Sequence, residues 1–383
     1  MLFSNTIHSF EDAQKIAMRR LPWMVFDYID GAAGTEYGEK LNRSIMRDLR
    51  LQPRVLTNVE DRSIAVNLFG KKTDLPFGIA PMGMCNLVSP HGDTFLAELA
   101  AKHSIPVGVS TVASTSLETM IETSKGNAWF QLYVSGSLDG STRLLDRARV
   151  AGYETLVLTV DVPEVGRRPR ELRRGFKMPF KIGPKQFVDF ACHPRWSLSQ
   201  LVHGKPSMAN FGGAFGEFDR TSSRAGANWG FFEKVRNCWK GNLVVKGVLS
   251  VEDAVKLKSM GADAIQVSSH GGRQLDSAPP AILALRNIRN AVGPEFPLFY
   301  DSGIRSGEDI VKAYAMGASF VFIGRPFSFA IAAGMAKGLD EMTACLADET
   351  SITLAQLGLK NIQAATHGVL ASTVNSTLNF HIE

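Results

Sequence analysis

The chain has 383 residues, of which 45% are hydrophobic, and a formal net charge of +5. No apolar run reaches the roughly 18 residues that a membrane-spanning helix needs, and the first residues lack the basic and apolar stretches of a signal peptide. The four cysteines are far apart and lack the spacing of a disulfide framework or a zinc site, so we expect neither, and no metal.

Eight apolar runs predict β-strands, because strands buried on both faces read as nearly continuous Val, Ile, Leu and Phe. In chain order the runs cover residues 75–82, 106–111, 129–134, 155–161, 242–245, 264–267, 297–300 and 320–323. Amphipathic helical stretches, such as residues 92–102 and 141–151, separate them. This alternation predicts an α/β protein with a (β/α)8 TIM barrel of about 250 residues, preceded by an N-terminal helical extension.

The fourth and fifth runs are separated by about fifty residues more than a βα unit needs, which predicts a long inserted loop. Residues 172–229 contain nine Lys and Arg residues, Arg224 among them, against three acids, and nine Phe and Trp residues are interleaved. Such a mixture suits an anionic membrane surface, and we place the contact loop at about residues 177–228. The alternative is a lid that packs on its own barrel or on a partner subunit. No nucleic-acid-binding module is recognised.

Polar residues directly follow the last four runs. They are Lys246, the segment SSHGGR at residues 268–273, the segment DSGIR at residues 301–305, and the pair Gly324 and Arg325. The carboxyl ends of barrel strands meet at one face, and barrel enzymes build their active sites there. No linker interrupts the pattern, so residues 1–383 are expected to form one domain with one site.

Eight motifs together resemble the FMN-dependent L-2-hydroxy acid dehydrogenases and oxidases. They are LPWMVFDY, WFQLYV, LTVD, GRRPR, VKGV, SSHGGRQLD, DSGIR and IGRP, and the resemblance as a whole covers about residue 10 to about residue 368. The pattern is most similar to the quinone-linked mandelate and lactate dehydrogenases of that family. No G-x-G-x-x-G fingerprint follows a strand, which disfavours a Rossmann nicotinamide site and agrees with FMN as the cofactor.

The resemblance implies roles for the residues that handle the substrate. His270 is the base, since its imidazole titrates near neutral pH, and Asp161 stabilises the imidazolium that forms. A planar guanidinium holds a carboxylate at two points, and the resemblance places Arg168 and Arg273 on the substrate carboxylate. Arg167 and Arg170 crowd Arg168, so its register stays open. The remaining implied contacts are Tyr28 near the carboxylate, Tyr133 on the substrate hydroxyl and Val112 beside the C2 substituent.

The resemblance also implies the cofactor contacts. Lys246 lies by flavin N1 and O2, where a cation stabilises the reduced ring, while the loops after the last two strands hold the phosphate. The phosphate residues are Gly303, Arg305, Gly324 and Arg325. The other implied contacts are Pro81, Met82 and Gly83 at the flavin face, Ser110, Gln131 and Thr159 at the isoalloxazine edge, and Ser268 and Asp301.

These assignments predict oxidation of an L-2-hydroxy acid to the 2-oxo acid, by a hydride or a carbanion route. Val112 replaces the Trp of glycolate oxidase, which leaves room for a lactate- or mandelate-like C2 substituent. Gly83 stands where oxidases of the family tend to carry Ala, and residues 192–198 and 203–211 resemble a membrane-binding segment. The prediction is therefore a peripheral protein on the cytoplasmic side of the cell membrane that reduces a quinone, and the family implies a homotetramer. The alternative is an oxidase that forms hydrogen peroxide.

Overall fold

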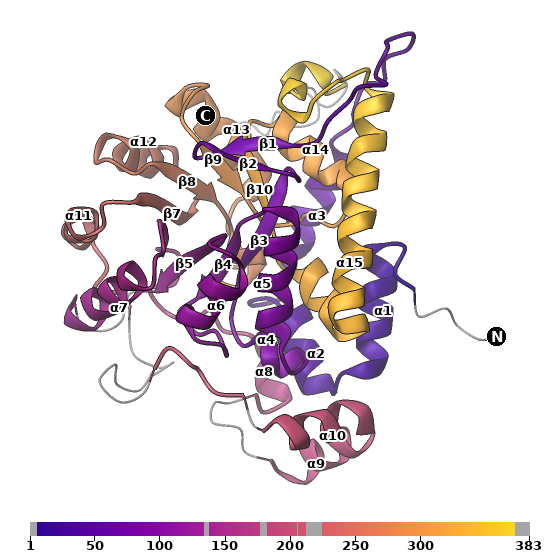
Figure 1. The fold of residues 1–383 in the computed structure, drawn as a ribbon, viewed down its shortest axis with the longest axis vertical. Helices are drawn as coiled ribbons and strands as arrows, with labels where there is room; N and C mark the ends of the chain where they lie inside the picture. Colours follow the sequence, from indigo (N-terminus) through magenta and orange to yellow (C-terminus); the bar gives the residue numbers. More distant parts are fainter. Residues whose placement is uncertain (1–5, 134–137, 177–181, 205, 212–223, 372–383) are drawn as a thin grey trace.

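A computed structural model describes residues 6–133, 138–176, 182–204, 206–211 and 224–371 (Figure 1). Eight parallel strands form a closed barrel in which each strand pairs with its sequence neighbour and the last, β10, pairs with the first, β3. These strands are β3 (Phe77–Met82), β4 (Val107–Ser110), β5 (Ala128–Tyr133), β6 (Thr155–Thr159), β7 (Asn242–Val248), β8 (Ala264–Val267), β9 (Leu298–Tyr300) and β10 (Phe320–Ile323). The predicted TIM barrel is thus confirmed.

A helix follows every barrel strand and covers the outside of the barrel. These helices are α5 (Gly92–His103), α6 (Leu117–Thr123), α7 (Leu138–Val150), α11 (Trp229–Cys238), α12 (Val251–Ser259), α13 (Ala281–Val292), α14 (Gly307–Ala315) and α15 (Arg325–Gln356). The helix predicted over residues 92–102 differs from α5 by one residue at its end. Met335 interrupts α15 with φ 52 and ψ −135, so this long element consists of two helical parts.

The predicted N-terminal extension is present. It consists of α1 (Phe10–Arg20), α2 (Trp23–Asp30) and α3 (Tyr37–Asp48), and α1 packs along α15. The Ser9 hydroxyl caps α1 by accepting a hydrogen bond from the Asp12 amide, 3.2 Å away, as expected for serine at a helix start. The extension therefore places α2 beside the carboxyl ends of the strands, where the predicted site lies.

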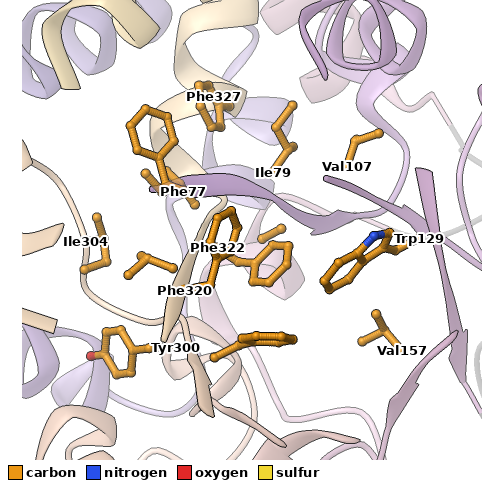
Figure 2. Close-up of a cluster of buried hydrophobic side chains, with 14 of the residues drawn as sticks. Phe77, Ile79, Val107, Trp129, Val157, Tyr300, Ile304, Phe320, Phe322 and Phe327 are labelled. Carbon is orange, nitrogen blue, oxygen red and sulfur yellow. The ribbon is translucent and has the colours of Figure 1, made fainter. Parts of the chain in front are cut away.

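The other end of the barrel is closed by the hairpin of β1 (Val66–Leu68) and β2 (Lys71–Thr73). Phe69, in its turn, packs on Trp129 and Phe299 with ring centres 5.7 and 5.6 Å away. Figure 2 shows Trp129 and Phe322 among the aromatic and branched side chains that fill the barrel, so this end is a packed core and not a pore.

The inserted segment contributes short helices to the opposite end of the molecule (Figure 1). After β6 come α8 (Pro169–Arg173), α9 (Pro184–Ala191) and α10 (Pro194–His203), and α4 (Cys85–Val88) lies in the loop after β3. Of the predicted contact loop at residues 177–228, residues 177–181, 205 and 212–223 fall outside the described part of the chain, as does residue 134 of the predicted third strand.

Candidate functional site

A cavity of about 240 Å³ opens at the carboxyl ends of the strands. Most of the predicted site residues line it, namely Tyr28, Pro81, Met82, Gly83, Val112, Tyr133, Arg168, Lys246, His270, Arg273, Asp301, Gly303, Arg305, Gly324 and Arg325. Five predicted residues lie behind its wall, namely Ser110, Gln131, Thr159, Asp161 and Ser268. One face of the barrel therefore gathers residues that are almost 300 positions apart in the sequence.

A buried ion pair stands at the centre of this face. Lys246 extends from β7, is 5% exposed, and lies 3.3 Å from the carboxylate of Asp301, which follows β9. Its ammonium also donates to the Ser268 hydroxyl at 2.9 Å, and that hydroxyl donates to Asp301 at 2.6 Å. Burial lowers the pKa of Lys246, but the charges of Asp301 and Asp161 outweigh burial and leave it above the usual value. Lys246 therefore stays cationic.

The imidazole of His270 is held by a carboxylate on its inner side. His270 Nδ1 lies 3.0 and 3.1 Å from the two carboxylate oxygens of Asp161. Nδ1 consequently carries the proton in the neutral ring, which leaves Nε2 as the acceptor. Burial lowers the pKa of His270, Asp161 opposes this and Lys246 reinforces it, and the net effect is a pKa below the usual value of histidine. The neutral imidazole is thus the resting form at pH 7, as a general base requires.

Arg273 and Tyr28 also line the cavity. Arg273 donates from Nη1 to the backbone oxygens of Tyr28 and Gly31, each at 2.8 Å, and its guanidinium lies 5.3 Å from the centre of the Tyr28 ring. The Tyr28 hydroxyl donates to the Gly83 oxygen at 3.1 Å. The helix α2 is therefore fixed to the cavity by both its backbone and its phenol.

Of the neighbouring arginines in GRRPR, the structure places Arg168 on the cavity. Its Nε donates to the Arg273 oxygen at 3.2 Å. Arg170 instead pairs with Asp27 at 2.6 Å and with Asp30 at 2.9 Å, while Arg167 is exposed. Of these three arginines, Arg168 is the one that lines the cavity together with Arg273, and its contact with a substrate carboxylate stays a prediction.

Two further guanidiniums lie at the part of the cavity formed by the loops after β9 and β10. Arg325 donates to the oxygens of Ile29, Gly31 and Gly271, and burial, helped by the charge of Arg305, lowers its pKa to about 9. Arg305 pairs with Glu39 at 3.1 Å, but its buried Nε has no acceptor within the described residues. Two crowded cations beside the backbone of Gly303, at φ 94, need an anion, and a flavin phosphate fits them.

Ser110, Gln131 and Thr159 form a hydrogen-bonded chain across β4, β5 and β6. The Ser110 hydroxyl donates to Gln131 Oε1 at 3.0 Å, and Gln131 Nε2 donates to the Thr159 hydroxyl at 2.9 Å. All three are buried behind the cavity wall. Their contact with the isoalloxazine edge stays a prediction.

Sequence reasoning missed the part of the inserted segment that builds the cavity. Met208 and Arg224 both line it, and the Arg224 guanidinium lies 5.5 Å from the centre of the Tyr133 ring. Arg224 is 5% exposed, so its assignment to the cationic surface of the segment is wrong. Asn210 is fully buried and its side-chain oxygen accepts from the Leu117 amide at 2.9 Å. No local pattern distinguishes these residues from surface ones.

The helices α9 and α10 form a hairpin that contacts both sides of the cavity entrance. Asp189 of α9 accepts from the amides of Trp23 and Met24 at 3.1 and 3.3 Å, which caps α2. Trp196 of α10 donates to the Leu87 oxygen in α4 at 2.9 Å. The hairpin also has exposed apolar side chains, at Ile182, Phe187, Val188, Leu198, Leu201 and Val202.

The fold and the cavity are those of a flavin-dependent oxidoreductase, and the comparisons define its family. The family of FMN-dependent dehydrogenases matches residues 17–372, so the chain belongs to it. It is 39% identical to (S)-mandelate dehydrogenase of Pseudomonas putida, over 94% of this chain and 92% of that protein. It is 34% identical to L-lactate dehydrogenase of Pseudomonas syringae pv. syringae (strain B728a), over 96% of this chain and 99% of that protein.

Solved structures give the same result. The crystal structure of the monotopic membrane protein (S)-mandelate dehydrogenase matches with a TM-score of 0.90 and 38% identity, covering 95% of this chain and 99% of that one. The crystal structure of mandelate oxidase matches with a TM-score of 0.82 and 35% identity, covering 94% and 97%. The chain is therefore an FMN-dependent 2-hydroxy acid dehydrogenase similar to the mandelate and lactate enzymes.

Gly247 allows a direct test of the Asp161 position. It has φ +101, and a Cβ there would lie 2.4 Å from the Asp161 carboxyl carbon. We expect Gly247→Ala to push Asp161 away from His270 and to lower kcat/KM on the order of 100-fold, the scale of a general-base contribution. The control is Gly152→Ala. Gly152 has a similar φ of +96, but a Cβ added there would have nothing within 4 Å. Equal kcat/KM values for the two variants would contradict this positioning role.

Proposed function

We propose that this protein oxidises an L-2-hydroxy acid of the lactate or mandelate type and passes the electrons from FMN to a membrane quinone. The observation that carries the proposal is the convergence of the His270–Asp161 pair, the guanidiniums of Arg168 and Arg273, and the ammonium of Lys246 on one cavity. A base, a carboxylate clamp and a cation beside the flavin are the groups that this oxidation needs.

Each group has a defined task. Arg168 and Arg273 hold the substrate carboxylate, and Tyr133 hydrogen-bonds the hydroxyl. His270 accepts a proton from the substrate at Nε2, and Asp161 stabilises the resulting imidazolium through Nδ1. Bound FMN supplies the acceptor for two electrons. Lys246 contributes a positive charge beside that acceptor, and its buried pairing with Asp301 keeps it in place.

The apolar lining of the cavity supports a hydrocarbon substituent on C2. Met82, Val112, Val165 and Met208 form this lining. Burying an alkyl or phenyl group against these side chains stabilises the complex by roughly 25 cal/mol per Å² of apolar surface. Neither the substituent nor these side chains would lose a hydrogen bond to water in the process. We therefore propose that 2-hydroxy acids with either a methyl or a phenyl substituent on C2 are substrates. The oligomeric state is a separate point, for which the family likeness supports a homotetramer.

The role of His270 is testable through the flavin spectrum. Anaerobic addition of L-lactate or (S)-mandelate should bleach the oxidised flavin, and His270→Asn should slow this bleaching by roughly 10²- to 10⁴-fold. Because the pKa of His270 is lowered from its usual value, kcat/KM should stay level through neutral pH and fall only as the pH drops through that lowered pKa and the base becomes protonated. His8→Asn, at an exposed position, is the control. A wild-type flavin that both acids leave oxidised would refute the activity.

The electron acceptor separates the proposal from its alternative. The similarity to mandelate oxidase supports an oxygen-using enzyme, whereas Gly83 and the exposed apolar hairpin support a quinone. We expect a short-chain quinone to reoxidise the reduced flavin far faster than air does, and hydrogen peroxide to form much more slowly than the 2-oxo acid. Peroxide formed in equal amount to the 2-oxo acid would establish the oxidase instead.

Peripheral membrane attachment through the α9–α10 hairpin is the second half of the proposal. The exposed apolar side chains of the hairpin lie beside Lys185 and Arg195, which are also exposed. Apolar side chains gain by entering the headgroup region, and each nearby cation adds about 1 kcal/mol at an anionic surface. No helix in the described ranges is long and apolar enough to cross a bilayer. We place the attachment on the cytoplasmic face of the cell membrane.

A surface substitution tests attachment better than deletion of the segment, because Met208, Arg224 and Asp189 also build the cavity or cap α2. Leu201 and Val202 are 79% and 80% exposed, so Leu201→Glu with Val202→Glu should abolish sedimentation with anionic vesicles. Turnover with a soluble dye should change by less than about twofold, since neither side chain packs on the site.

The matched control for attachment is Val55→Glu with Leu56→Glu. These neighbours are 82% and 104% exposed and lie by the end of α15 that is far from the hairpin (Figure 1), where Arg54 donates to the Gln356 oxygen. This variant should sediment like the wild type. If the wild type does not sediment with anionic vesicles at low salt, or if both variants lose binding equally, the hairpin is not the attachment surface.

A further inference from the structure

A buried carboxylate joins the two arginines of the proposed substrate clamp. Glu171 stands in the first turn of α8, three residues after Arg168, and is 4% exposed. Its Oε1 accepts from Arg273 Nη2 at 2.8 Å and from Arg168 Nη1 at 3.4 Å. One carboxylate oxygen thus lies between both guanidiniums.

This arrangement lowers the positive charge that the two arginines bring to the subsite. Arg168 and Arg273 carry two positive charges, and Glu171 carries one negative charge, so the three groups together carry one positive charge. Charges act strongly at this range when water is largely excluded, and the side chains of Arg168 and Arg273 are only 10% and 15% exposed. Glu171 thus offsets one of the two positive charges that these arginines present to a carboxylate, and the same pair without Glu171 would attract a dianion more strongly.

The hydrogen bonds of Arg273 leave room for such a ligand. A guanidinium has five N–H donors, and Arg273 uses two on the oxygens of Tyr28 and Gly31 and one on Glu171. Within the described part of the chain, its other two donors have no hydrogen-bonded acceptor, and Arg273 lines the cavity. Glu171 therefore orients the guanidinium and offsets its charge while donors remain for a carboxylate.

We infer that Glu171 is a specificity-determining residue, which holds Arg168 and Arg273 in place and restricts the subsite to 2-hydroxy monocarboxylates by cancelling one of their charges. The inference rests on the proposed function, because it takes these arginines as the ligands of the substrate carboxylate. Glu171 itself does not touch the reacting atoms. It acts through the two guanidiniums, so its removal should alter the choice between ligands of different charge.

Pyruvate and oxalate form a suitable pair of probes, since they have nearly the same size and differ by one negative charge. Their dissociation constants are measured on the FMN-loaded protein from the change in flavin absorbance. We expect Glu171→Gln to strengthen the binding of oxalate relative to that of pyruvate on the order of tenfold, because the substitution adds one net positive charge to the subsite. Glu171→Asp, with a shorter side chain, should shift the ratio in the same direction by a smaller factor.

The control is Glu164→Gln, which removes an exposed carboxylate from the same loop and should leave the ratio at the wild-type value. If neither Glu171 variant shifts the ratio by more than about twofold, or if both probes weaken equally, charge selection by Glu171 is wrong and only its packing matters. Failure of the proposed function would be seen separately, in the wild-type protein alone. In that case no 2-hydroxy acid would bleach the flavin, and no Glu171 variant would be needed to show it.

Discussion

The pairing of Lys246 with Asp301 is the constraint on which the catalytic face depends. Removing an ammonium from water costs several kcal/mol unless a carboxylate and hydrogen bonds replace the solvent. Here Asp301 and Ser268 replace it, and they come from the ends of β9 and β8 while Lys246 comes from β7. Three neighbouring strands must therefore keep their register for the charge to be tolerated. The same lysine adds to the field that keeps the imidazole of His270 neutral, so the charge state of the base follows from the packing of the barrel.

The sequence predicted the barrel and most of the cavity for a physical reason. A parallel strand buried on both faces must be apolar, and a polar residue directly after it must lie at the common end, which placed Lys246 and His270 correctly. Residues such as Glu171 and Met208 gave no such signal, because their roles depend on contacts between distant segments. Arg224 shows the limit most clearly. The number of Lys and Arg residues in the inserted segment led us to place Arg224 on its cationic surface. In the structure the chain folds back and buries Arg224 beside Tyr133.

The inserted segment has two faces with different chemistry. On its inner face Trp196 donates a hydrogen bond to the Leu87 oxygen and Asn210 accepts one from the Leu117 amide, while its outer face presents Leu201 and Val202 to solvent. The composition of the inserted segment allowed two interpretations, namely a lid that packs on the barrel and a membrane-contact surface. Composition cannot separate them, because residues packed inward, such as Trp196, and residues turned outward, such as Phe187 and Leu201, contribute to the same average.

The cap that Asp189 places on α2 has a mechanical consequence. The helix α2 begins directly after Pro22, whose side chain cannot accept a hydrogen bond from the first amides, and α9 provides the acceptor instead. The same short helix ends two residues after the phenol of Tyr28. A displacement of α9 by the proposed lipid surface would therefore also displace the first turn of α2, whose other end carries Tyr28 into the cavity. The proposed attachment surface and the cavity are thus joined through one short helix.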